Sequence, residues 1–185
     1  MESIIRDSIT EYFFANTFFS DKQYGFIKGR STTLQLLRIM DDWTEFLDSG
    51  GQIDVIYTDF AKAFDKVPHQ RLLAKLRLYG ITKEMLQCIE NFLCNRKQCV
   101  IINGVLSEWV TVRSGIPQGS ILGPILFLIY INDLPDYCNE SSTNCNMFLY
   151  ADDAILCRHI TSQEDNLSLQ REPLIDSKTG VTHGY

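Results

Sequence analysis

Three aspartates stand where carboxylates could bind a divalent cation. Asp152 and Asp153 are adjacent, and they lie between two short apolar segments, Met147–Tyr150 and Ala154–Cys157. Asp59 ends a third segment rich in apolar residues. Adjacent carboxylates repel each other, which raises one pKa unless a cation lies between them. Hard cations such as Mg²⁺ prefer oxygen ligands of this kind, so the three residues are a candidate metal site.

The chemistry that such a site would support is phosphoryl transfer. If the apolar segments are strands of one sheet, the three carboxylates meet at one edge and could hold two cations ~4 Å apart. Such a pair activates an attacking hydroxyl and stabilises a leaving pyrophosphate. The alternative for Asp152 and Asp153 is an ordinary solvated turn, because aspartate is common in turns.

The elements that must position these residues are predicted from periodicity. Residues 53–58 are rich in β-formers and predict a strand that runs into Asp59. The dipeptide Asn103-Gly104 predicts a hairpin between Gln98–Ile102 and Val105–Val112. Helices are predicted over residues 1–19, 31–50, 68–80, 82–94 and 120–131. This order predicts an α+β fold with a largely antiparallel sheet.

Apolar spacing also predicts which helix faces are buried. In residues 31–50 the expected face comprises Leu36, Ile39, Met40, Trp43, Phe46 and Leu47. In residues 68–80 it comprises Leu72, Leu73, Leu76 and Leu78, with Pro68 in the first turn. Ser31 and Thr82 are expected to cap their helices, and Gly50 and Gly80 to end the helices that precede them.

Composition is that of an ordinary globular protein, with 45% apolar and 22% charged residues. The N-terminus has no signal-peptide pattern, and the longest apolar stretch is too short for a membrane span. The six cysteines form no C-x-x-C pair, and no histidine lies at zinc-ligand spacing from them. We therefore expect reduced thiols in an intracellular protein of the cytoplasm or nucleus, not a secreted one, with no membrane partner.

The four sequence motifs that surround the aspartates resemble those of a known family, the reverse transcriptases of non-LTR retrotransposons, closest to the LINE-type, jockey-like elements. They occur in the family's order and are Gln23-Tyr-Gly-Phe-Ile-Lys-Gly-Arg-Ser-Thr32, Asp59-Phe-Ala-Lys-Ala-Phe-Asp65, Ser114-Gly-Ile-Pro-Gln-Gly-Ser-Ile-Leu-Gly-Pro124 and Phe148-Leu-Tyr-Ala-Asp-Asp153. The resemblance implies a polymerase palm with an antiparallel sheet flanked by helices, together with part of the fingers.

The resemblance also implies a role for each carboxylate. Asp59 and Asp152 would bind both of two Mg²⁺ ions, for which Mn²⁺ could substitute, and Asp153 would support the pair. The backbone carbonyl of Phe60 would be a further ligand of the nucleotide-bound metal.

Four residues are implied in nucleotide binding. Phe64 matches the aromatic gate that excludes a ribose 2′-hydroxyl, although packing in the core is the alternative. Gln118 and Gly119 match the loop beside the incoming nucleotide; without the resemblance, Gly115 to Gly119 would be only a helix entry. Tyr150 would lie near the primer end, or is simply a buried hairpin tyrosine.

The implied partners are an RNA template, a DNA primer and a deoxynucleoside triphosphate. Lys28 and Arg30 would contact template phosphates, with ordinary surface charge as the alternative. The net charge of −6 weighs against nucleic-acid binding unless basic parts are supplied by other segments.

We expect a reverse transcriptase domain in residues 1–160 and an irregular tail in 161–185. The family's remaining finger motif and thumb have no counterpart here, so the chain is expected to be a truncated or decayed element copy, or a partial gene model whose missing segments are encoded in flanking sequence. Two functions follow: an RNA-directed DNA polymerase, or a catalytically silent palm remnant that at most binds RNA weakly. An RNA-dependent RNA polymerase is disfavoured, because those enzymes usually carry Gly-Asp-Asp where this chain has Ala-Asp-Asp.

Overall fold

The structure, a computed structural model, describes residues 1–136 and 145–160, so the predicted tail at 161–185 lies outside the described residues. The chain divides into two compact units. One, here called the helical unit, comprises Met1–Ala15 and Phe64–Tyr130. The other, the sheet unit, comprises Asn16–Ala63 and the chain from Ile131 onward. Helices and antiparallel strands occur together, as the predicted α+β class requires.

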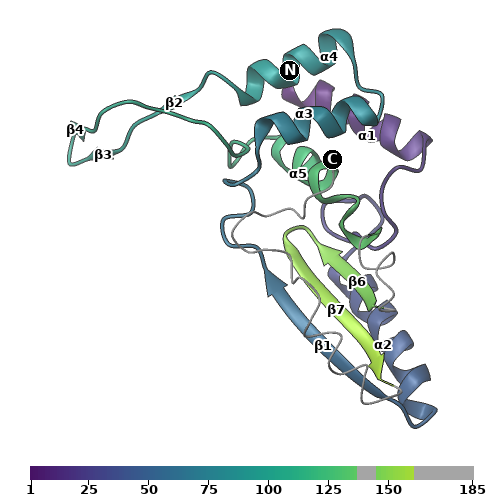
Figure 1. The fold of residues 1–185 in the computed structure, drawn as a ribbon. Helices are drawn as coiled ribbons and strands as arrows, with labels where there is room; N and C mark the ends of the chain where they lie inside the picture. The colour runs from purple at the N-terminus through teal and green to yellow at the C-terminus, as the bar shows by residue number, and fades with distance from the viewer. Residues whose placement is uncertain (137–144, 161–185) are drawn as a thin grey trace. The chain divides into compact units, whose positions relative to one another are not determined.

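The sheet unit contains a three-stranded antiparallel sheet in the order β1-β7-β6 (Figure 1). Its strands are β1 (Gln52–Asp59), β6 (Cys145–Tyr150) and β7 (Asp153–Ile160). They confirm the strands predicted on either side of the Asp152-Asp153 pair and before Asp59. Because β7 lies in the centre, the ends of both outer strands are held against one strand that begins at Asp153.

Helix α2 (Thr32–Asp48) has the ends that the sequence predicts. The hydroxyl of Ser31 accepts a hydrogen bond from the backbone N–H of Leu34 at 3.2 Å, which satisfies one unpaired amide of the first turn. At the other end Gly50 has φ +83°, and the N–H groups of Gly50 and Gly51 donate to the carbonyls of Leu47 and Phe46. This is a Schellman ending, which needs a residue in the left-handed region and therefore favours glycine.

The buried face of α2 differs from the prediction. Ile39 packs with Phe148 and Cys157, and Trp43 lies against this cluster from one side. Gln35 is also buried. Three of the leucines and methionines predicted to face the core are instead more than half exposed: Leu36, Met40 and Leu47. Apolar residues at spacings of three and four lie on two overlapping faces of α2, and only the narrow stripe that faces the sheet is buried.

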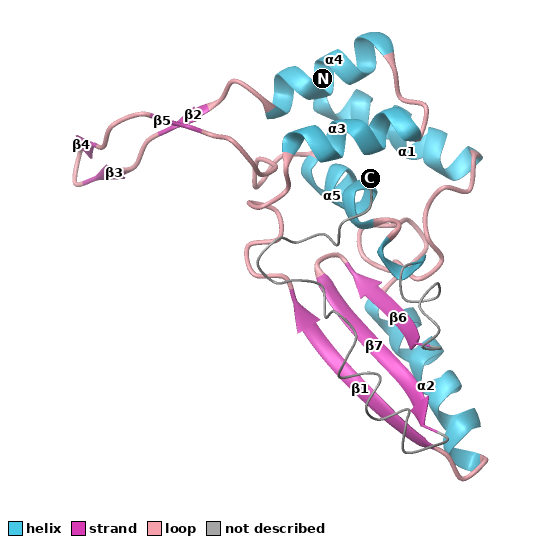
Figure 2. Ribbon diagram, in the orientation of Figure 1, coloured by secondary structure: helices cyan, strands magenta, loops and turns pink. Residues whose placement is uncertain are grey.

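The helical unit contains α1 (Glu2–Ala15), α3 (His69–Leu78), α4 (Lys83–Leu93) and α5 (Gly123–Ile131) (Figure 2). All four were predicted. Their fully buried side chains include Phe13, Leu72, Leu76, Ile89 and Leu126. Leu78 was predicted to belong to this core but is 86% exposed, because it follows Leu76 by two positions and so lies on the opposite side of the helix.

The boundaries of two helices in this unit also differ in detail from the prediction. Pro68 precedes α3 as its N-cap in an extended conformation, rather than lying in the first turn. Thr82 is the N-cap of α4, but its side chain makes no capping hydrogen bond. Gly80 ends α3 as predicted, with φ +86° and its N–H donating to the carbonyl of Arg77.

A β-hairpin between α4 and α5 extends away from the helices of its unit (Figures 1 and 2). Asn103 and Gly104 both have positive φ, +50° and +80°, as a type I′ turn requires. The strands are shorter than predicted, in two separate pairings of two residues each: β2 (Lys97–Gln98) with β5 (Val110–Thr111), and β3 (Ile101–Ile102) with β4 (Val105–Leu106). Its apolar side chains are largely exposed, among them Ile101, Val105 and Trp109.

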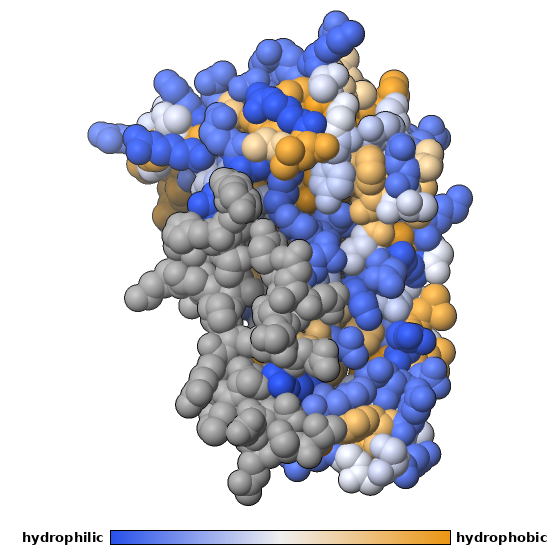
Figure 3. All heavy atoms as spheres, turned by 45° about the vertical axis from the view of Figure 1, so that its right-hand side comes forward, coloured by the Kyte–Doolittle hydropathy of each residue, from blue (hydrophilic) through white to orange (hydrophobic). Residues whose placement is uncertain are grey.

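Hydrophilic residues interrupt the hydrophobic ones over the face of the molecule drawn in Figure 3. Among the described residues, no helix is both long enough and apolar enough to cross a membrane.

Candidate active site

The three aspartates lie at one end of the β1-β7-β6 sheet. Asp59, the last residue of β1, is paired with Asp153, the first residue of β7. Asp153 is paired in turn with Tyr150, the last residue of β6. Cross-strand partners share a face of the sheet, so these residues form one row across the three strands. Asp152 precedes Asp153 in the tight connection from β6.

The connection between β6 and β7 is only Ala151 and Asp152. Ala151 is buried and has φ +55°, a backbone conformation that costs an alanine about 1–2 kcal/mol. A strained residue next to the candidate metal ligands must be held by its surroundings.

Electrostatic repulsion links the three carboxylates. The pKa of Asp153 is raised above its usual value, first by partial removal of its carboxylate from water and then by the negative charges of Asp152 and Asp59. The row therefore concentrates negative charge, and a divalent cation would relieve the repulsion.

The candidate donors suit a hard cation, since they are the carboxylate oxygens and the backbone carbonyl of Phe60, the residue that follows Asp59 in the chain. The carbonyl of Phe60 accepts a hydrogen bond from the N–H of Ala63 at 3.0 Å, and its second lone pair is a further oxygen donor. In residues 1–136 and 145–160, no three histidine, cysteine or acidic side chains are already gathered closely enough to hold a metal. Mg²⁺ is usually bound by one or two carboxylates completed by substrate phosphates, so the residues present fit such an ion.

The predicted phosphate contacts Lys28 and Arg30 lie in the loop before α2, and they differ in environment. Lys28 is exposed. Arg30 is partly buried, and its Nη1 donates to the carbonyl oxygens of Ser20 at 2.6 Å and of Gln23. Its guanidinium also lies 5.9 Å from the centre of the Tyr24 ring. Arg30 therefore holds the chain ahead of α2, and this internal role was not predicted.

Of the four predicted nucleotide-binding residues, Tyr150 ends β6 in the sheet unit and the other three belong to the helical unit. Phe64 is half-buried and stacks on Phe127 of α5, with ring centres 4.3 Å apart and an angle of 22° between the planes. This contact supports the packing alternative for Phe64, and its role as a gate stays a prediction.

Gln118 and Gly119 lie in the exposed loop before α5. The side-chain amide of Gln118 donates to Oδ1 of Asp65 at 3.0 Å. Gly119 has φ +78°, and a Cβ at this position would meet open space. The loop is therefore restrained at Gln118 and leaves room beside Gly119.

Gly115 anchors this loop. Its carbonyl accepts hydrogen bonds from His69 Nε2 at 2.9 Å and from the guanidinium of Arg96 at 2.8 Å. Because a carbonyl can only accept, His69 carries its proton on Nε2. The other ring nitrogen, Nδ1, lies 3.7 Å from the Cys94 sulfur. Burial, followed by the charge of Glu90, raises the pKa of Cys94, so its protonated thiol suits this acceptor.

The role of the three aspartates as metal ligands stays a prediction, and the sequence prediction missed several residues that hold loops within each unit. Asp65, His69 and Gly115 occur in or directly beside the quoted motifs, so their positions were a usable signal. Gln23 and Gly25, which contact the turn at Ala151, also occur in one of the four motifs. Arg96 carried no signal of its own.

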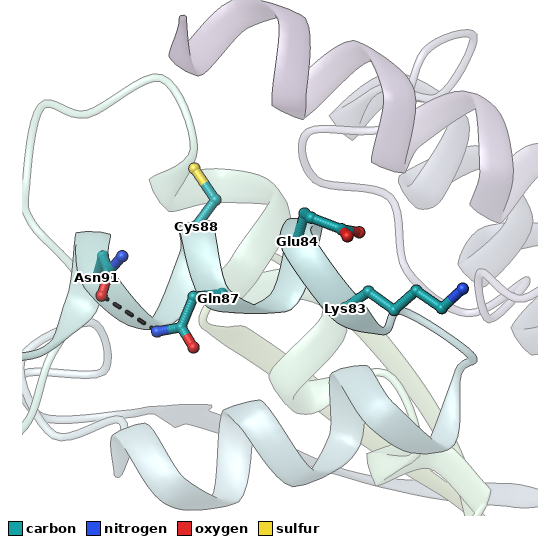
Figure 4. A pocket seen from close by; sticks show the side chains of 5 residues that line it. All are labelled: Lys83, Glu84, Gln87, Cys88 and Asn91. Carbon is teal, nitrogen blue, oxygen red and sulfur yellow. Dashed lines mark hydrogen bonds between the residues drawn. The ribbon is translucent and has the colours of Figure 1, made fainter.

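A shallow hollow on α4 is lined by Lys83, Glu84, Gln87, Cys88 and Asn91 (Figure 4). Gln87 donates to Asn91 across one helical turn at 3.2 Å. None of these residues was predicted as a site residue, and all of them come from a single helix surface.

Comparison with known proteins identifies the family to which the chain belongs. The family described as reverse transcriptase (RNA-dependent DNA polymerase) matches residues 1–176. The chain therefore belongs to the reverse transcriptase family.

The similar proteins include polymerases of mobile elements. One is the probable RNA-directed DNA polymerase from transposon BS of Drosophila melanogaster, 28% identical over 84% of this chain and 17% of that protein. Another is the RNA-directed DNA polymerase from mobile element jockey of Drosophila funebris, 33% identical over 62% of this chain and 12% of that protein. The predicted resemblance to jockey-like elements is confirmed. The chain spans less than a fifth of the length of these relatives.

Solved structures with a similar fold include two of telomerase from Candida tropicalis. The apo enzyme aligns with a TM-score of 0.71 at 13% identity, over 97% of this chain and 35% of that one. The enzyme in complex with the TWJ fragment of telomeric RNA aligns with a TM-score of 0.68 at 12% identity, over 94% and 31%. At this identity the likeness concerns the fold.

Proposed function

We propose that this chain is the part of a mobile-element RNA-directed DNA polymerase that carries the metal-binding carboxylates. The observation that supports the proposal best is the row formed by Asp59 and Asp153 at the sheet end, with Asp152 beside it in the turn. Family membership and the jockey and BS relatives support the same assignment.

In the proposed reaction a primer 3′-hydroxyl attacks the α-phosphate of a deoxynucleoside triphosphate, and pyrophosphate leaves. Two Mg²⁺ ions, when bound, would activate the hydroxyl and neutralise the leaving phosphates. Asp59 and Asp152 would bind these ions, with the carbonyl of Phe60, and Asp153 would support them electrostatically. Phe64, Gln118, Gly119 and Tyr150 would contact the nucleotide or primer end, and Lys28 the template.

We further propose an RNA template and a DNA primer as partners. The telomerase with a similar fold was solved with a fragment of telomeric RNA, which is consistent with RNA as a partner. An intracellular location is supported by four described cysteines that are free thiols, Cys88, Cys94, Cys99 and Cys157. Burial raises the pKa of the Cys157 thiol to about 11, so this thiol is not poised for exchange.

Primer extension on poly(rA)/oligo(dT) with dTTP and Mg²⁺ or Mn²⁺ tests the proposal. The wild-type chain is compared with a chain carrying Asp152→Ala and Asp153→Ala, and with Asp41→Asn, which changes an exposed aspartate of α2. Extension that the double variant abolishes and Asp41→Asn preserves would support the proposal. A folded chain that extends no primer, yet retains RNA in a filter-binding assay, would favour the silent RNA-binding remnant.

A further inference from the structure

A buried glutamine contacts the backbone of the turn that carries the aspartates. Gln23 is 1% exposed and lies in the segment ahead of α2, far from Ala151 in the sequence. Its Oε1 accepts a hydrogen bond from the N–H of Ala151 at 3.0 Å and another from the N–H of Gly25 at 2.7 Å. Its Nε2 lies 3.5 Å from the carbonyl oxygen of Ala151, at the outer limit of a hydrogen bond.

The orientation of this side chain follows from its partners. Two backbone N–H groups point at one atom of the amide, and only the oxygen can accept from them. The nitrogen must then face the Ala151 carbonyl. Gln23 thus contacts both peptide groups that flank Ala151, including the one that leads into Asp152.

The backbone of Gln23 is itself held from two sides. It pairs with Leu149 in a parallel bridge, in which Tyr24 N–H donates to the Leu149 carbonyl at 2.8 Å and Leu149 N–H donates to the Lys22 carbonyl at 2.9 Å. The guanidinium of Arg30 donates to the Gln23 carbonyl oxygen. The side chain therefore starts from a fixed point beside the last residues of β6.

Gly25 brings the two backbones close together. A Cβ at this position would lie 2.4 Å from the backbone nitrogen of Ala151 and 3.1 Å from its Cα. No side chain fits there without displacing the turn. This close approach requires a glycine at position 25, and the Gly25 N–H donates the second hydrogen bond to Oε1.

Ala151 needs such support. Its backbone is in the left-handed region at φ +55°, and its buried N–H requires a partner. We propose that Gln23 is a positioning residue that holds the Ala151–Asp152 turn, and through it the carboxylates of Asp152 and Asp153, in the conformation that binds a divalent metal. This inference rests on the metal-binding role proposed above for these aspartates.

Mn²⁺ affinity of the full chain, measured from the electron paramagnetic resonance signal of free Mn²⁺, tests the inference without requiring polymerase activity. Gln23→Met keeps the size of the side chain and removes its amide. Gln23→Glu keeps an oxygen for the two N–H groups and, when protonated in the buried site, a donor for the Ala151 carbonyl. Gln35→Met is the matched control, because Gln35 is a buried glutamine of the same unit whose Nε2 has no hydrogen-bond partner among the described residues.

We expect Gln23→Met to weaken Mn²⁺ binding about 10-fold or more, as loss of a residue that orients a ligand typically does. Gln23→Glu and Gln35→Met should bind close to wild type. A role in packing alone predicts the reverse order, since methionine fills the space and a buried glutamate is unfavourable. Wild-type affinity in a folded Gln23→Met chain would overturn the inference.

Two further outcomes separate this inference from the proposed function. Asp152→Asn is measured alongside, and wild-type Mn²⁺ affinity in that variant would show that the aspartates do not bind the metal, which overturns both proposals at their shared step. Loss of binding in Asp152→Asn with unchanged binding in Gln23→Met overturns only the role of Gln23. If circular dichroism shows that Gln23→Met is unfolded, Gln23→Glu decides: near-wild-type affinity supports the role, and a loss as large as that in Asp152→Asn contradicts it.

Discussion

Asp153 lies directly opposite Asp59 in the antiparallel pairing of β1 and β7, so two like charges face each other at the end of the sheet. The neighbouring Asp152 adds a third negative charge. A protein that did not use these groups would gain stability by replacing one of them, because like charges placed directly opposite are destabilising.

Replacing Asp153 by asparagine should therefore stabilise the metal-free chain. We expect Tm to rise by about 1–3 °C at neutral pH, since such a repulsion is worth about 0.2–1 kcal/mol and a chain of this size gains about 2–4 °C per kcal/mol. Differential scanning fluorimetry with EDTA measures the change. Asp41→Asn, which changes an exposed side chain of α2, should leave Tm unchanged. A lower Tm for Asp153→Asn would show that the repulsion does not limit stability.

Added Mg²⁺ should raise the Tm of the wild-type chain more than that of Asp153→Asn. The wild-type chain should gain Tm with millimolar Mg²⁺ because the ion binds only the folded state, and Asp153→Asn should gain less. Titration of Mg²⁺ against Tm for both chains measures the difference. Equal gains in the two chains would mean that the ion binds elsewhere.

The pH dependence of stability follows from the raised pKa of Asp153. Its folded-state pKa lies above its unfolded value, so in the acid range the folded chain binds more protons than the unfolded chain. The contribution of this group to stability is therefore full below the unfolded pKa of about 3.9 and is lost as pH rises through the folded pKa. Urea unfolding of wild type and Asp153→Asn from pH 3 to 7 without metal should show a difference that grows with pH. A difference that is constant across this range would contradict the prediction.

Gly115→Ala should destabilise the helical unit strongly. Gly115 has φ +90°, and an added Cβ would lie 2.7 Å from the carbonyl oxygen and 2.9 Å from the Cα of Asp65. Backbone strain of about 1–3 kcal/mol would add to this clash. Gly29→Ala is the matched control, because Gly29 has a similar φ of +84° but open space around the added Cβ. Urea denaturation should show a loss of unfolding free energy at least about 1 kcal/mol larger for Gly115→Ala than for Gly29→Ala. Equal losses would mean that the backbone at Asp65 moves to make room for the added Cβ.

Two leucines of α3 should respond very differently to truncation. Leu76 is fully buried and Leu78 is 86% exposed. We expect Leu76→Ala to lower the free energy of unfolding by about 2–5 kcal/mol and Leu78→Ala by less than about 0.5 kcal/mol. Chemical denaturation of both variants checks this. A large loss of unfolding free energy for Leu78→Ala would mean that Leu78 is buried, as its spacing first predicted.

Local patterns predicted most of the elements. The Ser31 cap, the Gly50 ending and the Asn103-Gly104 turn depend on neighbouring residues only, so they could be identified without tertiary structure. The buried face of α2 could not, because leucine and methionine occur on both sides of the helix and only contact with the sheet distinguishes them. Leu36, Met40 and Leu47 were placed in the core for this reason, and they are exposed.

The sequence by itself determined the family and most of the helices and strands, and it indicated three aspartates as candidate metal ligands, since these depend on residue type and on spacing along the chain. Only the tertiary structure decided that Asp59 is paired with Asp153 and that Gln23 contacts the turn at Ala151. Both relationships join residues about 90 or more positions apart. Their physical basis is strand register and the close approach of two backbones at Gly25, which no local pattern encodes.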